Sequence, residues 1–218
     1  ADMTAGVSRH QNNFKFHTSN SPNWDLLYRN MEKLIAVKDR KLNFYHIGGS
    51  HLQADIYTHD IRTKLQTRWE GVPGERGFLF PFDLARTNNP WNYEFSSSNK
   101  WKYYMSVRHD ICELDYGLLG AIVSCKDSVL DLHYRYDKTD VKPFFNKIRV
   151  YHNKGEFPVS FDFQENQQFI EEERLNEELG YTDFFFTKNI DSFDLIMRKD
   201  KDDAYEVSLS GVQLMNRE

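Results

Sequence analysis

Apolar side chains recur at helical spacing in the first third of the chain. After Ser21 and Pro22 they fall three or four residues apart, at Trp24, Leu27, Tyr28, Met31, Leu34 and Ile35. This spacing predicts one apolar helix face. Ser21 is typical of a residue that caps a helix N-terminus, and Pro22 is typical of a first helical position. We therefore expect a helix from residue 21 to about residue 38, preceded by an extended arm over residues 1–20.

The next stretch predicts a strand, a tight turn and a second helix. The run "LNFYHI", residues 42–47, is apolar at nearly every position, as expected of a strand buried on both faces. Gly48, Gly49 and Ser50 then form the turn. The second helix is predicted from about Gln53 to Trp69. Residues 21–82 thus indicate part of a layered α/β domain.

The pattern changes near Pro73. Residues 71–92, "GVPGERGFLFPFDLARTNNPWN", show no period and predict a long irregular connection. Short strand-like runs follow at Trp101–Arg108, Leu118–Cys125, Val129–Tyr136, Lys147–His152, Val159–Phe163, Tyr181–Thr187, Phe193–Arg198 and Tyr205–Leu214. Runs at this spacing predict a β-sandwich or jelly roll over residues 88–218. The charge-dense stretch from Ile170 to Gly180 is interpreted as a solvated helical face or loop.

The predicted fold class is therefore α+β, with a partial α/β segment followed by a β-sandwich. One strand and two helices cannot form an α/β domain without further strands. Either the strand at residues 42–47 joins an edge of the sandwich, or the chain is the N-terminal part of a longer protein. The strand-like ending "LSGVQLMNRE" favours the second interpretation.

Charge and composition exclude some classes of function. The net charge is −5, with 28 basic and 33 acidic residues, so there is no basic character that would favour nucleic acid. No run of 18 apolar residues predicts a membrane span, and no signal peptide is visible. Cys112 and Cys125 could pair or remain two free thiols.

Ser50 is the main candidate for chemistry. It follows a predicted strand and precedes a predicted helix, where backbone N–H groups can stabilise an oxyanion. The stretch is not a G-x-S-x-G motif, because Leu52 stands two residues after Ser50. The alternative is an ordinary turn in which Ser50 caps the second helix.

No histidine is clearly placed as the base that a serine nucleophile requires. His51 is adjacent to Ser50, His46 lies in the predicted strand, and His59 lies on the predicted helix. None of the eight histidines stands in a D-x-x-H setting. His51 and His59 could share one helix side with Asp55 and Asp60, but solvated polar residues explain this pattern better. We predict no metal and no cofactor.

Aromatic residues near the start of the sandwich suggest a carbohydrate contact. Trp91, Tyr93 and Trp101 are the candidates, with Tyr103 and Tyr104 close by in sequence. Exposed rings offer rigid contact area to a sugar face. Packing in the core is the more common role of such rings.

The string "FYHIGGSHLQADIYTHDIRTKLQ", followed by "GERGFLFPF" and "TNNPWNY", resembles GDSL-like esterases of the SGNH hydrolase superfamily. It is most similar to a bacterial type with a β-sandwich inserted after the first βα unit. The resemblance covers residues 40–95 by motif. It implies a flavodoxin-like catalytic domain, of which residues 21–82 are the first portion.

The resemblance also implies roles for individual residues. Ser50 matches the nucleophile, Gly48 and Gly49 form its loop, and the Ser50 N–H contributes to the oxyanion hole. His51 and Gln53 would support this loop. The remaining oxyanion donors and the D-x-x-H pair belong to later blocks that have no match in this sequence. Gly49 departs from the motif, which usually has aspartate there.

We therefore expect the N-terminal part of a serine esterase that acts on acylated, most simply acetylated, carbohydrate or cell-wall glycan. The resemblance implies export to the bacterial periplasm or cell surface. The chain by itself is expected to be inactive, and acyl transfer would use the same serine. The alternative is a non-catalytic carbohydrate-binding β-sandwich. The partners expected are an ester or glycan, with no nucleic acid.

Overall fold

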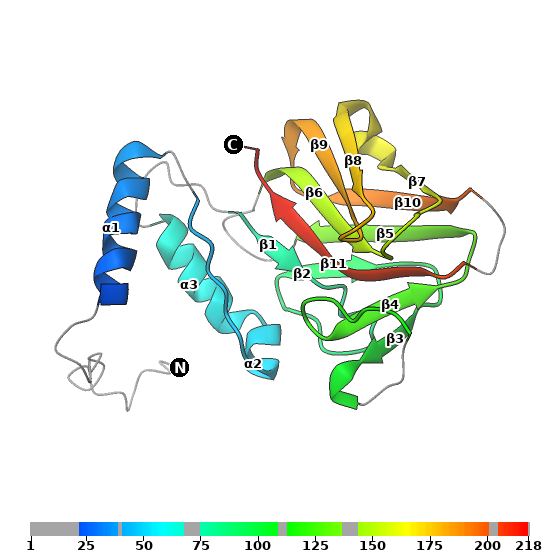
Figure 1. The fold of residues 1–218 in the computed structure, drawn as a ribbon, viewed down its shortest axis with the longest axis horizontal. Coiled ribbons are helices and arrows are strands. Elements are labelled where there is room, and N and C mark those ends of the chain that lie inside the picture. The colour runs from blue at the N-terminus through cyan, green and yellow to red at the C-terminus, as the bar shows by residue number, and fades with distance from the viewer. Residues whose placement is uncertain are drawn as a thin grey trace. The chain divides into compact units, whose positions relative to one another are not determined.

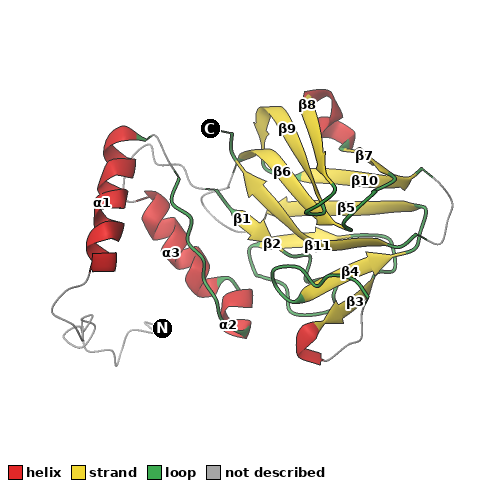
Figure 2. Ribbon diagram, viewed as in Figure 1, coloured by secondary structure: helices red, strands yellow, loops and turns green. Residues whose placement is uncertain are grey.

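The computed structural model describes residues 22–38, 41–67, 75–108, 113–136, 144–200 and 205–217. The chain divides into two compact units, residues 1–45 and residues 46–218, and each is treated by itself. Figures 1 and 2 show the helices and the two sheets.

Helix α1, Pro22–Val37, lies in the first unit and confirms the first predicted helix. It begins at Pro22, whose fixed φ suits a first helical position. It is followed by Lys38, whose φ of 56° is left-handed and whose N–H donates to the Leu34 carbonyl. Ser21, the predicted cap, lies outside the described residues. None of the residues of α1 is buried.

The strand predicted at residues 42–47 is wrong. The structure shows no strand there, and the side chains of Phe44, Tyr45 and Ile47 are 52%, 78% and 97% exposed. A strand requires a neighbour that completes its hydrogen bonds. Among the described strands, none pairs with this segment, so its apolar run remains extended and unpaired.

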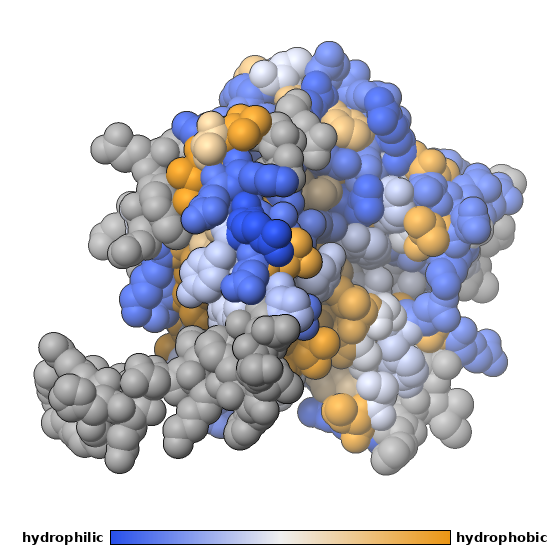
Figure 3. All heavy atoms as spheres, turned by 60° about the vertical axis from the view of Figure 1, so that its left-hand side comes forward, coloured by the Kyte–Doolittle hydropathy of each residue, from blue (hydrophilic) through white to orange (hydrophobic). Residues whose placement is uncertain are grey.

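The second predicted helix is two helices. Helix α2, Ser50–Gln53, is separated from helix α3, Ile56–Thr67, by Ala54 and Asp55. Asp55 has a left-handed φ of 52°, which ends one helix and re-aims the chain for the next. Apolar side chains of α3 reach the surface at Ile56, Tyr57 and Ile61. Figure 3 shows apolar and polar side chains interleaved on one face of the molecule.

The rest of the second unit is built on two antiparallel sheets. The seven-stranded sheet has the order β3-β4-β11-β6-β9-β8, and β1 also pairs with β11. Its strands are β1 (Gly77–Leu79), β3 (Lys102–Met105), β4 (Ala121–Cys125), β6 (Phe145–His152), β8 (Ile170–Asn176), β9 (Tyr181–Ile190) and β11 (Val207–Met215). The four-stranded sheet has the order β2-β5-β10-β7. Its strands are β2 (Tyr93–Ser96), β5 (Val129–Tyr136), β7 (Val159–Asp162) and β10 (Phe193–Lys199). Two short 3₁₀ helices, Ser106–Arg108 and Gln164–Phe169, lie between strands.

Each of the eight predicted strand-like runs contains a strand, which confirms the antiparallel β character of this part. Three strands were missed: β1, β2 and β8. The helix-or-loop interpretation of residues 170–180 is wrong, because β8 pairs with β9 along this charged stretch. Its charges suit an edge strand, where exposed side chains meet water. The sheets also include β1, which precedes the predicted start of the sandwich at residue 88.

Aromatic side chains from both sheets form the core between them. Tyr134 of β5 lies 6.1 Å, between ring centroids, from Phe145 of β6, and Phe161 of β7 lies 4.9 Å from Phe184 of β9. Phe163 contacts Phe184 from the connection that follows β7. Full burial of such a ring contributes roughly 1.5–3 kcal/mol. These contacts hold the sheets face to face, which is consistent with a β-sandwich.

Cys125 is a buried free thiol. Burial raises its pKa above the ordinary value, which keeps it protonated and unreactive near neutral pH. Cys112, the other residue of the pair considered from the sequence, lies outside the described residues.

Gly211 allows β1 to dock on β11. The β11–β6 register shifts between Leu209 and Gly211. A Cβ atom at Gly211 would lie 2.2 Å from Cζ of Phe78 and 3.1 Å from the Leu79 carbonyl. The Phe78 ring therefore occupies the space that any larger residue at position 211 would need.

We predict that Gly211→Ala destabilises the protein by about 1–3 kcal/mol, because the added methyl group overpacks this site. Urea unfolding measures the loss. Gly49→Ala is the matched control, since a Cβ there meets nothing within 4 Å. In the Phe78→Ala background the cost of Gly211→Ala should fall, with only the close contact to the Leu79 carbonyl and the backbone conformation of residue 211 remaining, and an unchanged cost would show that the ring is not the obstacle.

Candidate functional site

Ser50 is the first residue of α2 and is exposed. Gly49 occupies the cap position with φ −93° and ψ −149°, and no side chain caps this helix. Ser50 is therefore not the helix cap that the ordinary-turn alternative required. Within the described part of the chain, no hydrogen bond engages its hydroxyl, which is free to meet a ligand.

The two glycines before Ser50 differ in their surroundings. A Cβ at Gly48 would lie 2.7 Å from Cδ1 of Leu52. A Cβ at Gly49 would meet nothing within 4 Å, and its φ is one that any residue adopts. Packing therefore favours glycine at position 48, whereas position 49 has room for the aspartate of the family motif.

Gln53 attaches α2 to the segment between β1 and β2. Its side-chain amide donates to the Asn88 carbonyl at 2.7 Å and to the Thr87 hydroxyl at 3.3 Å. His51, two residues earlier, is exposed. Of the two residues that the resemblance placed in support of the loop, Gln53 thus has a defined anchoring contact.

Asp55 is the most connected polar residue of this region. Its side chain is 7% exposed and accepts hydrogen bonds from both sides of the α3–sandwich junction. Arg62 donates at 2.9 Å from α3, Arg76 donates at 2.7 Å from just before β1, and Asn92 donates at 2.8 Å from just before β2. The Thr58 hydroxyl donates to the same carboxylate. One carboxylate thus joins three segments of the chain.

The charges around Asp55 keep it ionised. Burial by itself would raise the pKa of Asp55, but the positive charges of Arg76 and Arg62 and the bonds from Arg62 and Thr58 bring it below the ordinary value of 3.8. The pKa of Arg62 is lowered in turn, because burial and the nearby charge of Arg76 disfavour its charged form. Two cations thus face one buried anion, so removal of the anion would leave both cations uncompensated.

His59 lies at the edge of this cluster and is turned towards the sandwich. Its Nδ1 lies 3.2 Å from the Asn92 amide nitrogen, and its ring meets the edge of Trp91 with centroids 5.1 Å apart. Burial and the charge of Arg62 lower its pKa. Because an amide nitrogen can only donate, Nδ1 is the acceptor of the bond from Asn92. These contacts make His59 a structural histidine, and no bond joins it to Ser50 in the described structure.

The candidate glycan contacts differ in exposure. Trp91 is 43% exposed, whereas Tyr93 and Trp101 are 4% and 5% exposed. The Tyr93 ring packs in the core against Phe95, and the Trp101 indole N–H donates to the Ser97 hydroxyl at 2.8 Å. Trp91 is the one of the three with a largely open ring.

Sequence reasoning did not find the Asp55 cluster. A signal was present, because Asp before an apolar-periodic run is typical of a helix start. The sequence pattern instead groups Asp55 with His51, His59 and Asp60 as possible metal ligands. Among the described residues, no group of three or more histidine, cysteine or acidic side chains could hold a metal ion.

We predict that Asp55→Asn costs about 3–5 kcal/mol at neutral pH, because it leaves two buried arginines without their anion. Asparagine keeps the shape and tolerates the left-handed φ. The pKa of Asp55 is lower in the folded state than its ordinary value of 3.8. The ionised carboxylate therefore stabilises the fold above pH 3.8, and this stabilisation is lost as the pH falls through the folded-state pKa. The gap between wild type and variant should therefore narrow on acidification below about pH 4.

Urea unfolding at several pH values gives this gap. Asp60→Asn is the control, since its carboxylate is 60% exposed and, among the described residues, pairs with Lys64 alone; it should cost no more than about 0.5 kcal/mol. A similar small effect at both positions would mean that Asp55 does not organise the junction.

No family model matches the chain, and no curated protein matches it. Among the described helices, none is long and apolar enough to cross a membrane.

Proposed function

We propose that this chain carries the nucleophile segment of a serine esterase of the SGNH type. The observation that supports this most is the state of Ser50. Its hydroxyl is exposed and unbonded among the described residues, at the start of a helix that Gln53 and Asp55 fasten to the sandwich. A nucleophile needs this combination of a free reactive atom and a fixed backbone.

In the proposed reaction, Ser50 Oγ bonds to the ester carbonyl carbon as a base removes its proton. The carbonyl oxygen becomes the oxyanion, which the Ser50 N–H helps to stabilise. The carbon–oxygen bond to the alcohol then breaks, and the alcohol takes the proton. Water releases the acid by the same steps. An acceptor alcohol in place of water would give acyl transfer.

Among the described residues, no histidine is hydrogen-bonded to Ser50 as a base would be. The sequence contains no D-x-x-H, and His59 is engaged with Asn92 and Trp91. We therefore infer that a histidine outside this chain completes the site, along with the other oxyanion donors. The resemblance places the substrate among acylated carbohydrates or cell-wall glycans and places the protein outside the cytoplasm.

The finer fold assignment belongs to the same proposal. Residues 21–82 would be the first portion of a flavodoxin-like domain, whose further strands would pair with the exposed run at residues 42–47. Residues 88–218 would form the main part of a jelly roll. The order β4-β11-β6-β9 opposite β5-β10-β7 supports this, because these seven strands alternate between the sheets along the chain. Strand β8, which pairs with β9 in the same sheet, interrupts the alternation.

We predict that Ser50 is acetylated faster than an ordinary surface serine. With p-nitrophenyl acetate, and imidazole as an added base, the backbone at Ser50 should favour its acylation by roughly ten-fold or more. Peptide mass spectrometry gives the rate at each serine. Ser96, exposed on β2, is an internal comparison, and Ser50→Ala should abolish the fast site.

Equal acetylation of Ser50 and Ser96 would contradict the proposal. A fast rate without imidazole would show that a histidine of this chain acts as the base, which would contradict the inference that the base lies elsewhere.

A further inference from the structure

A hollow of about 320 Å³ opens beside the edge strand β3. It is lined by Arg86, Trp101, Lys102, Tyr103 and Tyr104. Its size is at the lower end of the range for small-molecule sites. The lining comes from β3, the residue before it, and the turn that ends at Arg86, so two separate segments of the second unit form it.

The aromatic part of the lining is held in place. The Trp101 indole donates to Ser97 at 2.8 Å. The Arg108 guanidinium lies 5.3 Å from the Tyr103 ring centroid and donates to its hydroxyl at 3.1 Å. Because Trp101 is only 5% exposed, the Tyr103 ring is the surface that a ligand can reach, and its fixed position reduces the entropy lost when a ligand binds.

The charged part of the lining is positive and largely unpaired. Both charged residues, Arg86 and Lys102, are exposed cations, and no lining residue is acidic. Lys102 lies 4.0 Å from the Glu206 carboxylate, at the outer limit of an ion pair, and Ser124 donates to that carboxylate at 2.7 Å. In the described part of the chain, the Arg86 guanidinium has no partner. This is a local excess of positive charge on a protein of net charge −5.

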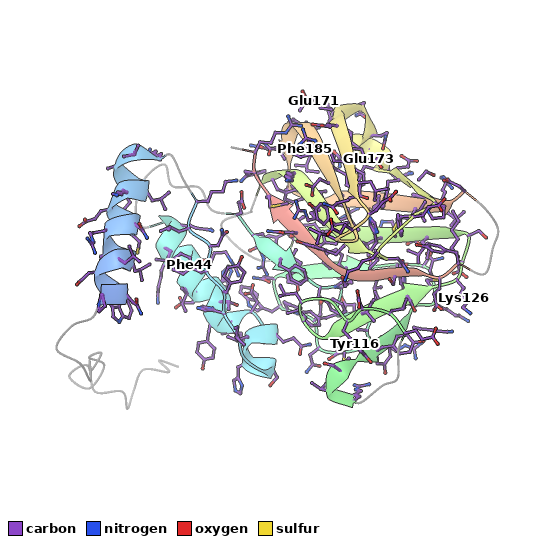
Figure 4. All side chains as sticks on the ribbon, viewed as in Figure 1. Phe44, Tyr116, Lys126, Glu171, Glu173 and Phe185 are labelled. Carbon is purple, nitrogen blue, oxygen red and sulfur yellow. The ribbon has the colours of Figure 1, made fainter. Side chains whose placement is uncertain are left out.

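The outer face of the seven-stranded sheet offers an instructive contrast. It also combines cations and rings, but its groups are already engaged. Asp183 accepts from Arg149 at 2.6 Å and pairs with Lys147 at 3.0 Å, while Lys147 and Arg174 lie over the Phe185 ring. Figure 4 labels Phe185 on this sheet, and Glu172 of β8 is its partner in the register. The Asp183 carboxylate and the cations around it thus engage one another, whereas the Arg86 guanidinium of the hollow has no such partner among the described residues.

The four-stranded sheet carries a second closed network. His133 lies between Asp194 at 2.6 Å and Asp131 at 2.9 Å, and Arg135 donates two bonds to Asp194. These groups likewise satisfy one another. Compared with these two networks of the described residues, the hollow at β3 combines a fixed ring with an unpaired Arg86 and with a Lys102 that is only 4.0 Å from a carboxylate.

We propose that this hollow binds an acidic sugar residue of a glycan. The carboxylate of a uronic acid would pair with Arg86 and Lys102, and the sugar face would pack on the tyrosine rings. Rings by themselves would suit a neutral sugar, and cations by themselves a simple anion; their combination favours a sugar that carries a carboxylate. This binding does not involve Ser50 and goes beyond the proposed esterase activity.

The test uses trigalacturonic acid as the probe and its methyl ester as the neutral counterpart, with binding followed by tryptophan fluorescence. We expect the acid to bind and the ester to bind about ten-fold more weakly. Binding of the acid should weaken as the salt concentration rises from about 0.05 M to about 0.5 M, because exposed charges are screened. Arg86→Ala and Lys102→Ala should each reduce its affinity about five-fold or more.

Matched controls remove an equal charge elsewhere. Arg198 on β10 and Lys126 after β4 are both exposed, so Arg198→Ala and Lys126→Ala should leave affinity unchanged. Ser50→Ala should also bind normally, which separates this inference from the proposed catalysis. All four cations are exposed, and thermal melts check that their variants fold.

Three results would overturn the proposal. The ester could bind as well as the acid, the control variants could lose as much affinity as the hollow variants, or the probe could fail to bind. Equal competition by acetate at the same concentration would show an anion site with no sugar recognition, which also contradicts it.

Discussion

The buried carboxylate of Asp55 is the interaction on which the candidate site depends. Asp55 lies between α2 and α3. Its carboxylate accepts hydrogen bonds from Arg62, Arg76 and Asn92, which belong to three different segments. A buried anion is expensive unless it is paired and fully hydrogen-bonded. Because its partners come from separate segments, satisfying this one group fixes α3 on the sandwich.

The Asp55 contacts help to position Ser50, although Ser50 itself makes none of them. Gln53 and Asp55 fasten the far end of α2, while the segment before Ser50 is exposed and unpaired. The turn is therefore held on one side and open on the other. This arrangement would suit the nucleophile that we propose, which must be fixed relative to the sandwich and yet remain accessible.

The sandwich could be predicted because the alternation of buried and exposed residues within each strand is visible in the sequence. In "VLDLHYRY" of β5, core and outward side chains alternate, and the run coincides with the strand. β8 was missed because an edge strand with glutamates and Arg174 facing water loses this alternation. Residues 42–47 misled for the opposite reason. Their composition is that of a buried strand, but a strand forms only with a partner, and sequence pattern does not show whether one is present.

The site was predicted only where residue chemistry marks it. Glycines and a serine drew attention to residues 48–50, and the structure places Ser50 at a helix start. The Asp55 cluster was missed because Arg76 and Asn92 lie 21 and 37 residues away. Such pairings depend on the tertiary structure, which brings the residues just before β1 and β2 next to Asp55. Likewise, Tyr93 and Trp101 are buried because the strands around them turn these rings inward.

The account is tested most directly by the coupling energy between Asp55 and Arg76. A double-mutant cycle of Asp55→Ala, Arg76→Ala and the double variant, followed by urea unfolding at neutral pH, gives this quantity. If the carboxylate joins α3 to the sandwich, the double variant should lose little more free energy of unfolding than either single variant. The coupling energy should then be about 2 kcal/mol or more. Losses that add to within about 0.5 kcal/mol would mean that the two residues act independently and would contradict the account.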